Sequence, residues 1–520
     1  MYPIGQSKMN RRAALKTIAL AASSVFAFSA ENVAGNSPLA QAIYHNAKAY
    51  WSEGKNENPI DIQPHLQGPE IDEKLHRIST AIDTIQAEDQ RVSKGLDVVS
   101  ACLRSYNNRG TPRTLIPDYE DTLDRIVLSC LGNFKGADVT ATQRELINNL
   151  PEYTQIYVGT FPFLLDGKYK NGAEARFHSG GSAPTHWMQD FAEGDSQTKV
   201  IPLAMRTQSK AISHNGAISL FTYLCVKEIR EIPIVYDGGN IFSARNRSKE
   251  NVVIVGENSL FATNKRLFES LGFRYSVDEY KEVVSKTFGA SQTVILCSEE
   301  GRIGRQSSFL YDLDVAMMPM NDGLIALLKV DEPPEKPKYS NEEASKMWEE
   351  SRASYFNKLR TFTEKYGNLI IKPSNMPNEE WQMLQSLEAD LKRWSREVDS
   401  VVDYERIQKI NGSLNLYRSQ LEKAGFSIIS VPTSLDHMKY HASFVNGVPY
   451  RDKETNKQTF IMPIFPDNLG SNIDGKMDFS LTGMNGRAMK AIESYGINVI
   501  PVKDFGAFTL GGVLYCLTCR

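Results

Sequence analysis

The sequence lacks the cysteine density, the net charge and the long apolar runs that would place it in several common protein classes. Its 520 residues include only six cysteines, too few for a disulfide framework in so long a chain. A formal net charge of −3 predicts neither nucleic-acid binding nor a polyanionic partner. The content of 41% hydrophobic and 23% charged residues is that of a globular protein, with length for one large core or two to three domains.

The first 42 residues have the pattern of an export segment. Arg11 and Arg12 precede an apolar stretch over residues 18–30, and this order resembles a twin-arginine export signal. The stretch is too short and too rich in alanine for a stable membrane span. Cleavage could follow Ser29 or Ala42, and we expect a periplasmic or secreted protein.

Hydrophobic spacing predicts a helical subdomain after the export segment. Residues 43–70 are polar and irregular, as in a linker, and apolar residues three and four apart predict one long amphipathic helix over residues 71–106. Further helices are expected over residues 119–131 and 142–150. We therefore assign residues 43–150 to a linker and a helical subdomain.

Short β-prone runs separated by turns predict an α/β domain in two parts, residues 151–330 and 426–520. Residues 331–425 interrupt it with a charged, proline-containing linker and a helical hairpin that Pro373 and Pro377 divide. We favour a structural role for the hairpin over a lid or a partner-docking arm. The expected strands cover 154–161, 200–205, 232–236, 252–255, 293–297, 311–318, 324–330, 427–431, 460–465 and 499–502, with helices over 263–271 and 486–495.

Two stretches have the residue types of a cation site. Asp190 closely follows Trp187, so a carboxylate could bind a cation while the indole face lies against it, although such an aspartate is more often a turn residue or a cap. Gly238 and Gly239 follow a predicted strand. Paired glycines let the backbone approach a neighbour or a ligand closely, or simply form a hairpin turn.

Asp312 and Asp314 are two residues apart in a run that otherwise has the pattern of a buried strand. The period of a strand would place both side chains on one face. Because unpaired buried charge is costly, two such carboxylates indicate a cation, a metal ion or a shared proton, and solvated positions at a sheet edge are the alternative.

His437 and His441 would share one face of a helix, but a zinc site would need a third ligand, so we favour ordinary hydrogen-bonding roles. Cys516 lies on a predicted strand over residues 513–518, with Cys519 three positions later. A C-x-x-C pair suggests redox chemistry or half of a metal site, but the sequence has no second pair, and residues three apart on a strand point to opposite faces.

In this order the motifs resemble those of the guanidine-modifying superfamily, which includes peptidylarginine, agmatine and arginine deiminases and amidinotransferases. The resemblance covers residues 151–330 and 425–520. The matching stretches are Trp187-Met-Gln-Asp190, Asp237-Gly-Gly-Asn240, residues 251–264, Ser443-Phe-Val-Asn446 with residues 460–466, and the terminal Gly511-Gly-Val-Leu-Tyr-Cys-Leu-Thr518.

The resemblance implies a five-bladed propeller of ββαβ units with added N-terminal helices and an inserted helical hairpin. It also implies that Asp190 and Asp314 hold a guanidinium group, with Trp187 and Asn446 in the binding site. The Cys516 thiolate would attack the guanidinium carbon, ammonia would leave, and water would release a ureido product. The implied partner is a guanidino compound or an arginine-containing protein.

The chain departs from the family where a histidine is expected two residues before the second aspartate, because Asp312 stands there. A raised pKa would let Asp312 act as the acid–base group, or His441 or His186 would replace the missing histidine. Otherwise the site binds a guanidinium group or another cation without converting it. The alternatives to a deiminase are therefore a guanidinium-binding protein and an amidinotransferase. No metal or other cofactor is predicted, and calcium dependence stays open because Phe191 replaces an acidic residue of the peptidylarginine deiminase motif.

Overall fold

The computed structural model describes most of the chain beyond the N-terminal segment. The described residues are 37–68, 70–87, 89–108, 110, 112–130, 138–160, 175–177, 192–195, 197–204, 221, 226–299, 312–332, 336–367, 369, 371–466, 469, 479–510 and 513–519. Within these ranges no helix is long and apolar enough to cross a membrane.

The described strands form five small sheets with one pairing pattern. In each sheet the first strand named below pairs antiparallel with the second, and the second pairs parallel with the third. The sheets are β4 (Glu193–Gly194), β5 (Thr198–Ala204) and β6 (Glu228–Val235); β7 (Ile241–Arg245), β8 (Asn251–Gly256) and β9 (Gln292–Leu296); β10 (Met317–Asn321), β11 (Leu324–Val330) and β12 (Ser427–Thr433); β13 (Val448–Arg451), β14 (Gln458–Ile464) and β15 (Asn498–Lys503); and β16 (Thr518–Cys519), β1 (Arg125–Cys130) and β2 (Gln155–Thr160), which also pairs with β3 (Ala175–Phe177).

In four of the five sheets, described helices connect the parallel strands, because a parallel pair needs a crossover that returns the chain to the same end of the sheet. The crossovers contain α5 (Val139–Asn148), α7 (Glu257–Leu271) with α8 (Val277–Phe288), α9 (Asn341–Tyr366) with α10 (Asn378–Lys423), and α12 (Met484–Glu493). The helical pair expected within residues 331–425 therefore occupies the β11–β12 crossover. The mixed α/β class predicted from the sequence is confirmed.

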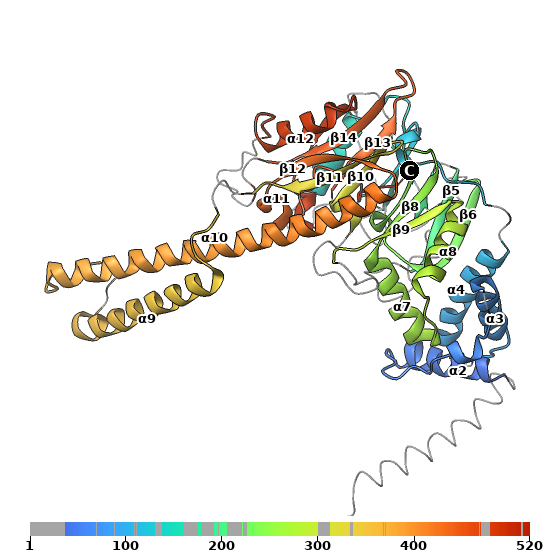
Figure 1. Cartoon of the computed structure of the whole chain (residues 1–520), viewed down its shortest axis with the longest axis horizontal. Helices are drawn as coiled ribbons and strands as arrows, with labels where there is room; N and C mark the ends of the chain where they lie inside the picture. The colour runs from blue at the N-terminus through green and yellow to red at the C-terminus, as the bar shows by residue number, and fades with distance from the viewer. Residues whose placement is uncertain are drawn as a thin grey trace, which may run out of the picture.

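Helices α9 and α10 lie side by side and extend away from the sheets (Figure 1). The extended part has an apolar cluster of its own around Phe362, Met376 and Leu384. The other end of α10 packs into the main core through Leu414 and Leu421. The sequence predicted both helices and their separation, because the chain between them contains Pro373 and Pro377.

Two helix predictions near the N-terminus are wrong. The single helix expected over residues 71–106 is two helices, α3 (Ile71–Asp83) and α4 (Gln90–Asn107), because Asp89 caps the start of α4 by accepting a hydrogen bond from the Arg91 N–H at 2.7 Å. The helix expected over residues 119–131 is instead η3 (Asp118–Glu120) followed by β1, whose apolar run pairs with β2 and β16.

A second apolar core joins the N-terminal helices to the sheet of β7, β8 and β9 and to β6. Helix α2 (Pro38–Ala47) begins this region, followed by η1 (Lys48–Ser52) and η2 (Gln63–His65). Ala40, Ile43 and Ala47 of α2 are fully buried. Because α2 and the sheets share one core, these helices are an integral part of the fold. The remaining short elements are η6 (Gly238–Asn240), η7 (Leu313–Val315), α11 (Leu435–Lys439) and η8 (Ala507–Leu510).

Candidate functional site

The described candidate residues lie in connections between consecutive sheets. Asn240 lies between β6 and β7, Asp314 between β9 and β10, Asn446 between β12 and β13, and Cys516 between β15 and β16. Because the sheet pattern repeats, each of these four connections contributes one polar or nucleophilic residue to the candidate site. His186, Trp187 and Asp190, which belong to the fifth connection, lie outside the described residues.

Cys516 lies in a turn, so the strand predicted over residues 513–518 is wrong. The Leu517 N–H donates to the Val513 carbonyl at 3.2 Å, and the Thr518 N–H donates to the Tyr515 carbonyl at 3.1 Å. These local bonds leave only Thr518 and Cys519 for strand β16. The Cys516 side chain is buried within this turn. The expected orientation of the Cys519 side chain lies outside what the structure describes.

Asp312 and Asp314 do not share a strand, because the strand expected over residues 311–318 begins only at Met317. The Ala316 N–H donates to the Leu313 carbonyl at 2.8 Å and closes η7 around Asp314, while Asp312 precedes it in an extended conformation. Asp314 is 0% exposed and Asp312 is half-buried. The two carboxylates therefore have different surroundings, which the period-two argument did not predict.

Cys516 and Asp314 are in direct contact. The Cys516 Sγ donates to Oδ2 of Asp314 at 2.9 Å, between residues 202 positions apart in the chain. The Asn446 Nδ2 lies 3.2 Å from the same sulfur, and the Asn446 Oδ1 accepts the Tyr515 N–H at 3.1 Å. Because Oδ1 receives a backbone N–H, the amide group of Asn446 is oriented with its donor toward sulfur. Asn446 was expected to bind substrate, and its described side-chain contacts are with the nucleophile turn and with Asp314.

The carboxyl group of Asp314 has an unusual environment. Burial, and after it the neighbouring Asp312 carboxylate, raise the pKa of Asp314 to about 8, against the lowering effect of its bonds with Cys516 and Asn446. Among the described residues its Oδ1 is fully buried and has no hydrogen-bond partner. A buried acceptor of this kind is costly unless a donor reaches it, so the site favours a ligand with N–H groups and positive charge.

At Gly239 the backbone lies close to the Asp314 side chain. Close approach of this kind was one of the two alternatives that the sequence analysis gave for the paired glycines, the other being a hairpin turn. A Cβ atom on Gly239 would lie 2.4 Å from Oδ2 of Asp314. The Asn240 Nδ2 donates to Oδ1 of Asp312 at 3.0 Å, and a Cβ atom on Gly256 would lie 2.2 Å from Oδ1 of Asn240. The sequence analysis did not select Asn240 as a site residue, although Asp237-Gly-Gly-Asn240 was one of the matching motifs.

His437 and His441 are the histidines that the sequence analysis considered in this part of the chain. His437 Nδ1 lies 2.6 Å from the Ser434 Oγ, its ring is 5.0 Å from the ring of Phe444, and burial lowers the pKa of His437 to about 4. The hydrogen-bonding role expected for His437 fits these contacts. His441 follows α11 on an exposed turn with φ of 57°. Within the described part of the chain, neither histidine contacts Asp314.

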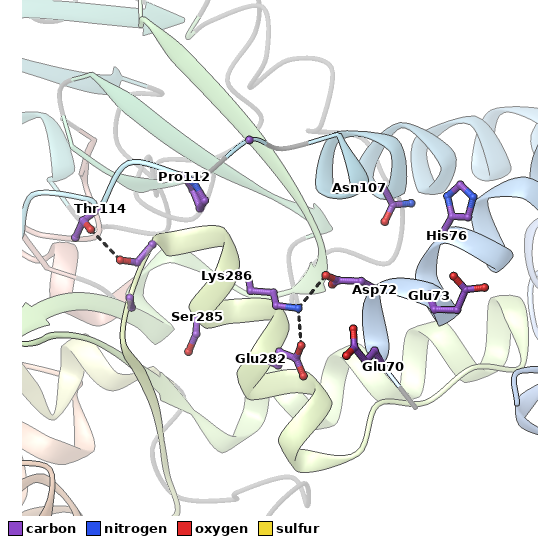
Figure 2. Close-up of a pocket in the computed structure, with 13 residues that line it drawn as sticks. Glu70, Asp72, Glu73, His76, Asn107, Pro112, Thr114, Glu282, Ser285 and Lys286 are labelled. Atoms are coloured by element: carbon purple, nitrogen blue, oxygen red, sulfur yellow. Dashed lines mark hydrogen bonds and ion pairs between the residues drawn. The ribbon is translucent and has the colours of Figure 1, made fainter. Parts of the chain in front are cut away.

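A separate groove lies between α3, the end of α4 and α8 (Figure 2). Its lining includes Glu70, Asp72, Glu73 and Glu282. Lys286 bridges Asp72 at 2.8 Å and Glu282 at 2.5 Å, so part of the negative charge is already paired. None of the described candidate residues lines this groove.

Comparison with known proteins finds similarity only to solved structures. No family model matches the chain, and no curated protein matches it. The chain resembles an agmatine deiminase from C. jejuni, with 14% identity, coverage of 78% of this chain and 94% of that chain, and a TM-score of 0.43. For an agmatine deiminase from Enterococcus faecalis the identity is 10%, the coverage is 78% of this chain and 94% of that chain, and the TM-score is 0.42. For the N-terminal domain of ArgZ, a cyanobacterial arginine dihydrolase, the identity is 10%, the coverage is 76% of this chain and 97% of that chain, and the TM-score is 0.34.

Proposed function

We propose that this chain belongs to the guanidine-modifying superfamily and is a deiminase-type hydrolase that converts a guanidino group into a ureido group and ammonia. The contact of the Cys516 sulfur with Oδ2 of Asp314, in a buried site, is the observation that carries the proposal. The substrate is a guanidino compound or an arginine-containing protein. We also propose that the five sheets are the blades of a propeller around the site, since their pairing repeats and their connections supply its residues.

The buried carboxylate selects the charge of the ligand. A guanidinium cation brings N–H donors to the Oδ1 of Asp314 that has no partner among the described residues. Its positive charge offsets the burial that disfavours ionisation of Asp314, so the ionised carboxylate forms as the cation binds. Trp187 and Asp190 complete the binding site in this proposal, as the sequence motif implies.

Cys516 supplies the nucleophile. Its thiolate forms a bond to the guanidinium carbon, and the Asn446 amide donates to the sulfur before attack. One nitrogen takes a proton and leaves as ammonia, while the carbon stays bound to sulfur. Water then adds to that carbon, the sulfur–carbon bond breaks, and the ureido product leaves. A guanidinium cation and one water thus yield a neutral ureido compound and an ammonium ion.

We assign the proton transfers to Asp312. Its half-buried carboxyl group receives the Asn240 amide on Oδ1, which fixes its position near Asp314. In this role Asp312 takes the proton that the Cys516 thiol loses, donates it to the leaving nitrogen and then accepts one from the attacking water. We further propose that the protein is exported through its twin-arginine-type segment and acts in the periplasm or outside the cell.

Product analysis tests the proposal. Purified protein is incubated with arginine, agmatine and an arginine-containing peptide, and ureido product and ammonia are measured. We expect both products from at least one substrate, and none from Cys516→Ala. Failure of folded wild-type protein with all three substrates, in the presence and absence of calcium, would reject the hydrolase.

The replacement of the family histidine by Asp312 favours a guanidinium-binding protein as the second candidate. That candidate predicts binding of guanidino compounds that survives Cys516→Ala, without turnover by the wild type. Turnover that appears only in Asp312→His would support it. An amidinotransferase would instead transfer the amidino group to added glycine or lysine.

A further inference from the structure

Tyr515, directly before the nucleophile, has its hydroxyl group on a carboxylate from the N-terminal part of the chain. The hydroxyl donates to Oδ2 of Asp118 at 2.6 Å, across a sequence separation of 397 residues. Tyr515 is 1% exposed, and its ring lies 5.8 Å from the ring of Phe242. A short bond to a carboxylate at a buried position holds a side chain more firmly than a bond between neutral groups. The nucleophile turn is therefore fixed at its tyrosine.

The residues next to Asp118 are fixed to other sheets. Glu120 forms an ion pair with Arg245 of β7 at 2.5 Å, and the Arg451 N–H of β13 donates to the Asp121 carbonyl at 2.9 Å. The carboxylate that receives the Tyr515 hydroxyl therefore belongs to a segment held by two sheets.

Tyr515 also connects this segment to the sulfur. Its backbone N–H donates to the Asn446 Oδ1 at 3.1 Å, and the Asn446 Nδ2 lies 3.2 Å from the Cys516 sulfur. The Tyr515 hydroxyl thus fixes the nucleophile turn, and the Tyr515 N–H orients the Asn446 amide that faces the Cys516 sulfur. An amide that donates to a thiolate stabilises the charged form of the sulfur.

We infer that Asp118 and Tyr515 are positioning residues for the nucleophile, and that their hydrogen bond sets how well Asn446 stabilises the Cys516 thiolate. The inference extends the proposed function, on which it rests for the role of Cys516. It concerns the reactivity of the thiolate, so it can be measured without any guanidino substrate.

Alkylation of the protein by iodoacetamide reports this reactivity, because the thiolate is the reacting form. The rate at Cys516 is followed by peptide mass spectrometry from pH 6 to pH 10. For Tyr515→Phe we expect about a fivefold lower rate at pH 7, since the loss of one hydrogen bond corresponds to about that factor. We also expect the midpoint of the pH dependence to move upward.

Two further variants separate positioning from stability. Asp118→Asn keeps an acceptor for the Tyr515 hydroxyl and is expected to restore much of the rate that Asp118→Leu loses. Tyr106→Phe is the matched control, because Tyr106 is also 1% exposed and donates its hydroxyl to a carboxylate, Asp72, at 2.9 Å. This control is expected to lower the melting temperature without changing the alkylation rate at Cys516.

The outcomes distinguish the inference from the proposed function. Slower alkylation in Tyr515→Phe and Asp118→Leu, with normal rates in Tyr106→Phe, supports positioning even where no substrate is turned over. Equal rates and equal pH midpoints in wild type and Tyr515→Phe would overturn it, whatever the melting temperatures. A change in Tyr106→Phe as large as that in Tyr515→Phe would also overturn it, because both would then reflect general loosening of the fold.

Discussion

The Cys516 sulfur and Oδ2 of Asp314 share a hydrogen bond of 2.9 Å inside a buried site. Since Asp314 is 0% exposed and lies near Asp312, its negative charge is disfavoured when the site holds no cation. The same burial strengthens its attraction to a bound cation, because the local dielectric constant is lower than that of water. One carboxyl group therefore links ligand charge, proton release and folding stability.

The first prediction concerns stability and pH in Asp314→Asn. The pKa of Asp314 is about 8 in the folded protein, above its ordinary value of 3.8, so the folded state holds a proton that the unfolded state releases. The contribution of Asp314 to stability is thus greatest below about pH 4 and is lost as the pH rises toward 8. We expect the variant to be more stable than wild type at pH 8 by about 1 to 3 kcal/mol.

Urea unfolding at pH 5 and pH 8 measures this difference. Asp278→Asn is a suitable control, because Asp278 is an exposed residue in the first turn of α8. It should change stability by a similar small amount at both pH values. If wild type and Asp314→Asn lose equal stability between pH 5 and pH 8, the raised pKa of Asp314 is wrong.

The second prediction is proton release on ligand binding. At pH 7 the buried Asp314 carries its proton for much of the time, and pairing with a guanidinium cation requires the ionised form. Cys516→Ser protein that binds arginine or agmatine should therefore release up to about one proton. Titration calorimetry in two buffers of different ionisation enthalpy measures the number released. A binding enthalpy that is identical in both buffers would contradict the prediction, and Asp314→Asn in the same background should abolish the buffer dependence.

The third prediction concerns the missing side chain at Gly239. The Cβ of Gly239→Ala would lie 2.4 Å from a carboxylate oxygen of Asp314, whose short side chain is fully buried. We expect loss of guanidinium binding and a destabilisation of about 1 to 3 kcal/mol from overpacking. Gly412→Ala is the matched control, because its Cβ would meet nothing within 4 Å and it lies in α10. It should raise stability by about 0.5 to 1 kcal/mol. Unchanged binding in Gly239→Ala would show that Asp314 does not need this space.

The fourth prediction concerns the proposed export segment and the choice between its two possible cleavage positions. Cleavage after Ala42 would divide α2, where Ala40 and Ile43 are fully buried and the Ser37 Oγ accepts the Ala40 N–H at 3.4 Å. A protease needs an exposed, extended substrate, so we expect cleavage after Ser29 instead. Sequencing the N-terminus of exported protein tests this, and Ala27→Phe should block processing. A mature chain that begins at Ile43 would refute it.

Local patterns predicted most of the regular elements. Alternating or continuous apolar runs identified β2, β5, β6, β8, β9, β11, β12, β14 and β15, and proline and spacing identified α9 and α10. These signals are local, because each depends on the residues within one or two turns of the chain. Two of the predictions that are wrong lie where a short polar contact overrides the local pattern. Asp89 caps the start of α4 where one continuous helix was expected, and a hydrogen bond from the Ala316 N–H closes η7 where a strand was expected.

The sequence by itself determined that paired aspartates, an asparagine and a cysteine occur in a fixed order along the α/β part of the chain. It could not determine that Asp314, rather than Asp312, is the fully buried carboxylate in contact with Cys516, since neighbouring residues differ in burial only once other segments cover them. Nor could it link Tyr515 to Asp118, which are 397 residues apart. The tertiary structure decided these relationships, because the energy of a buried charge or hydrogen bond depends on which distant groups replace its water.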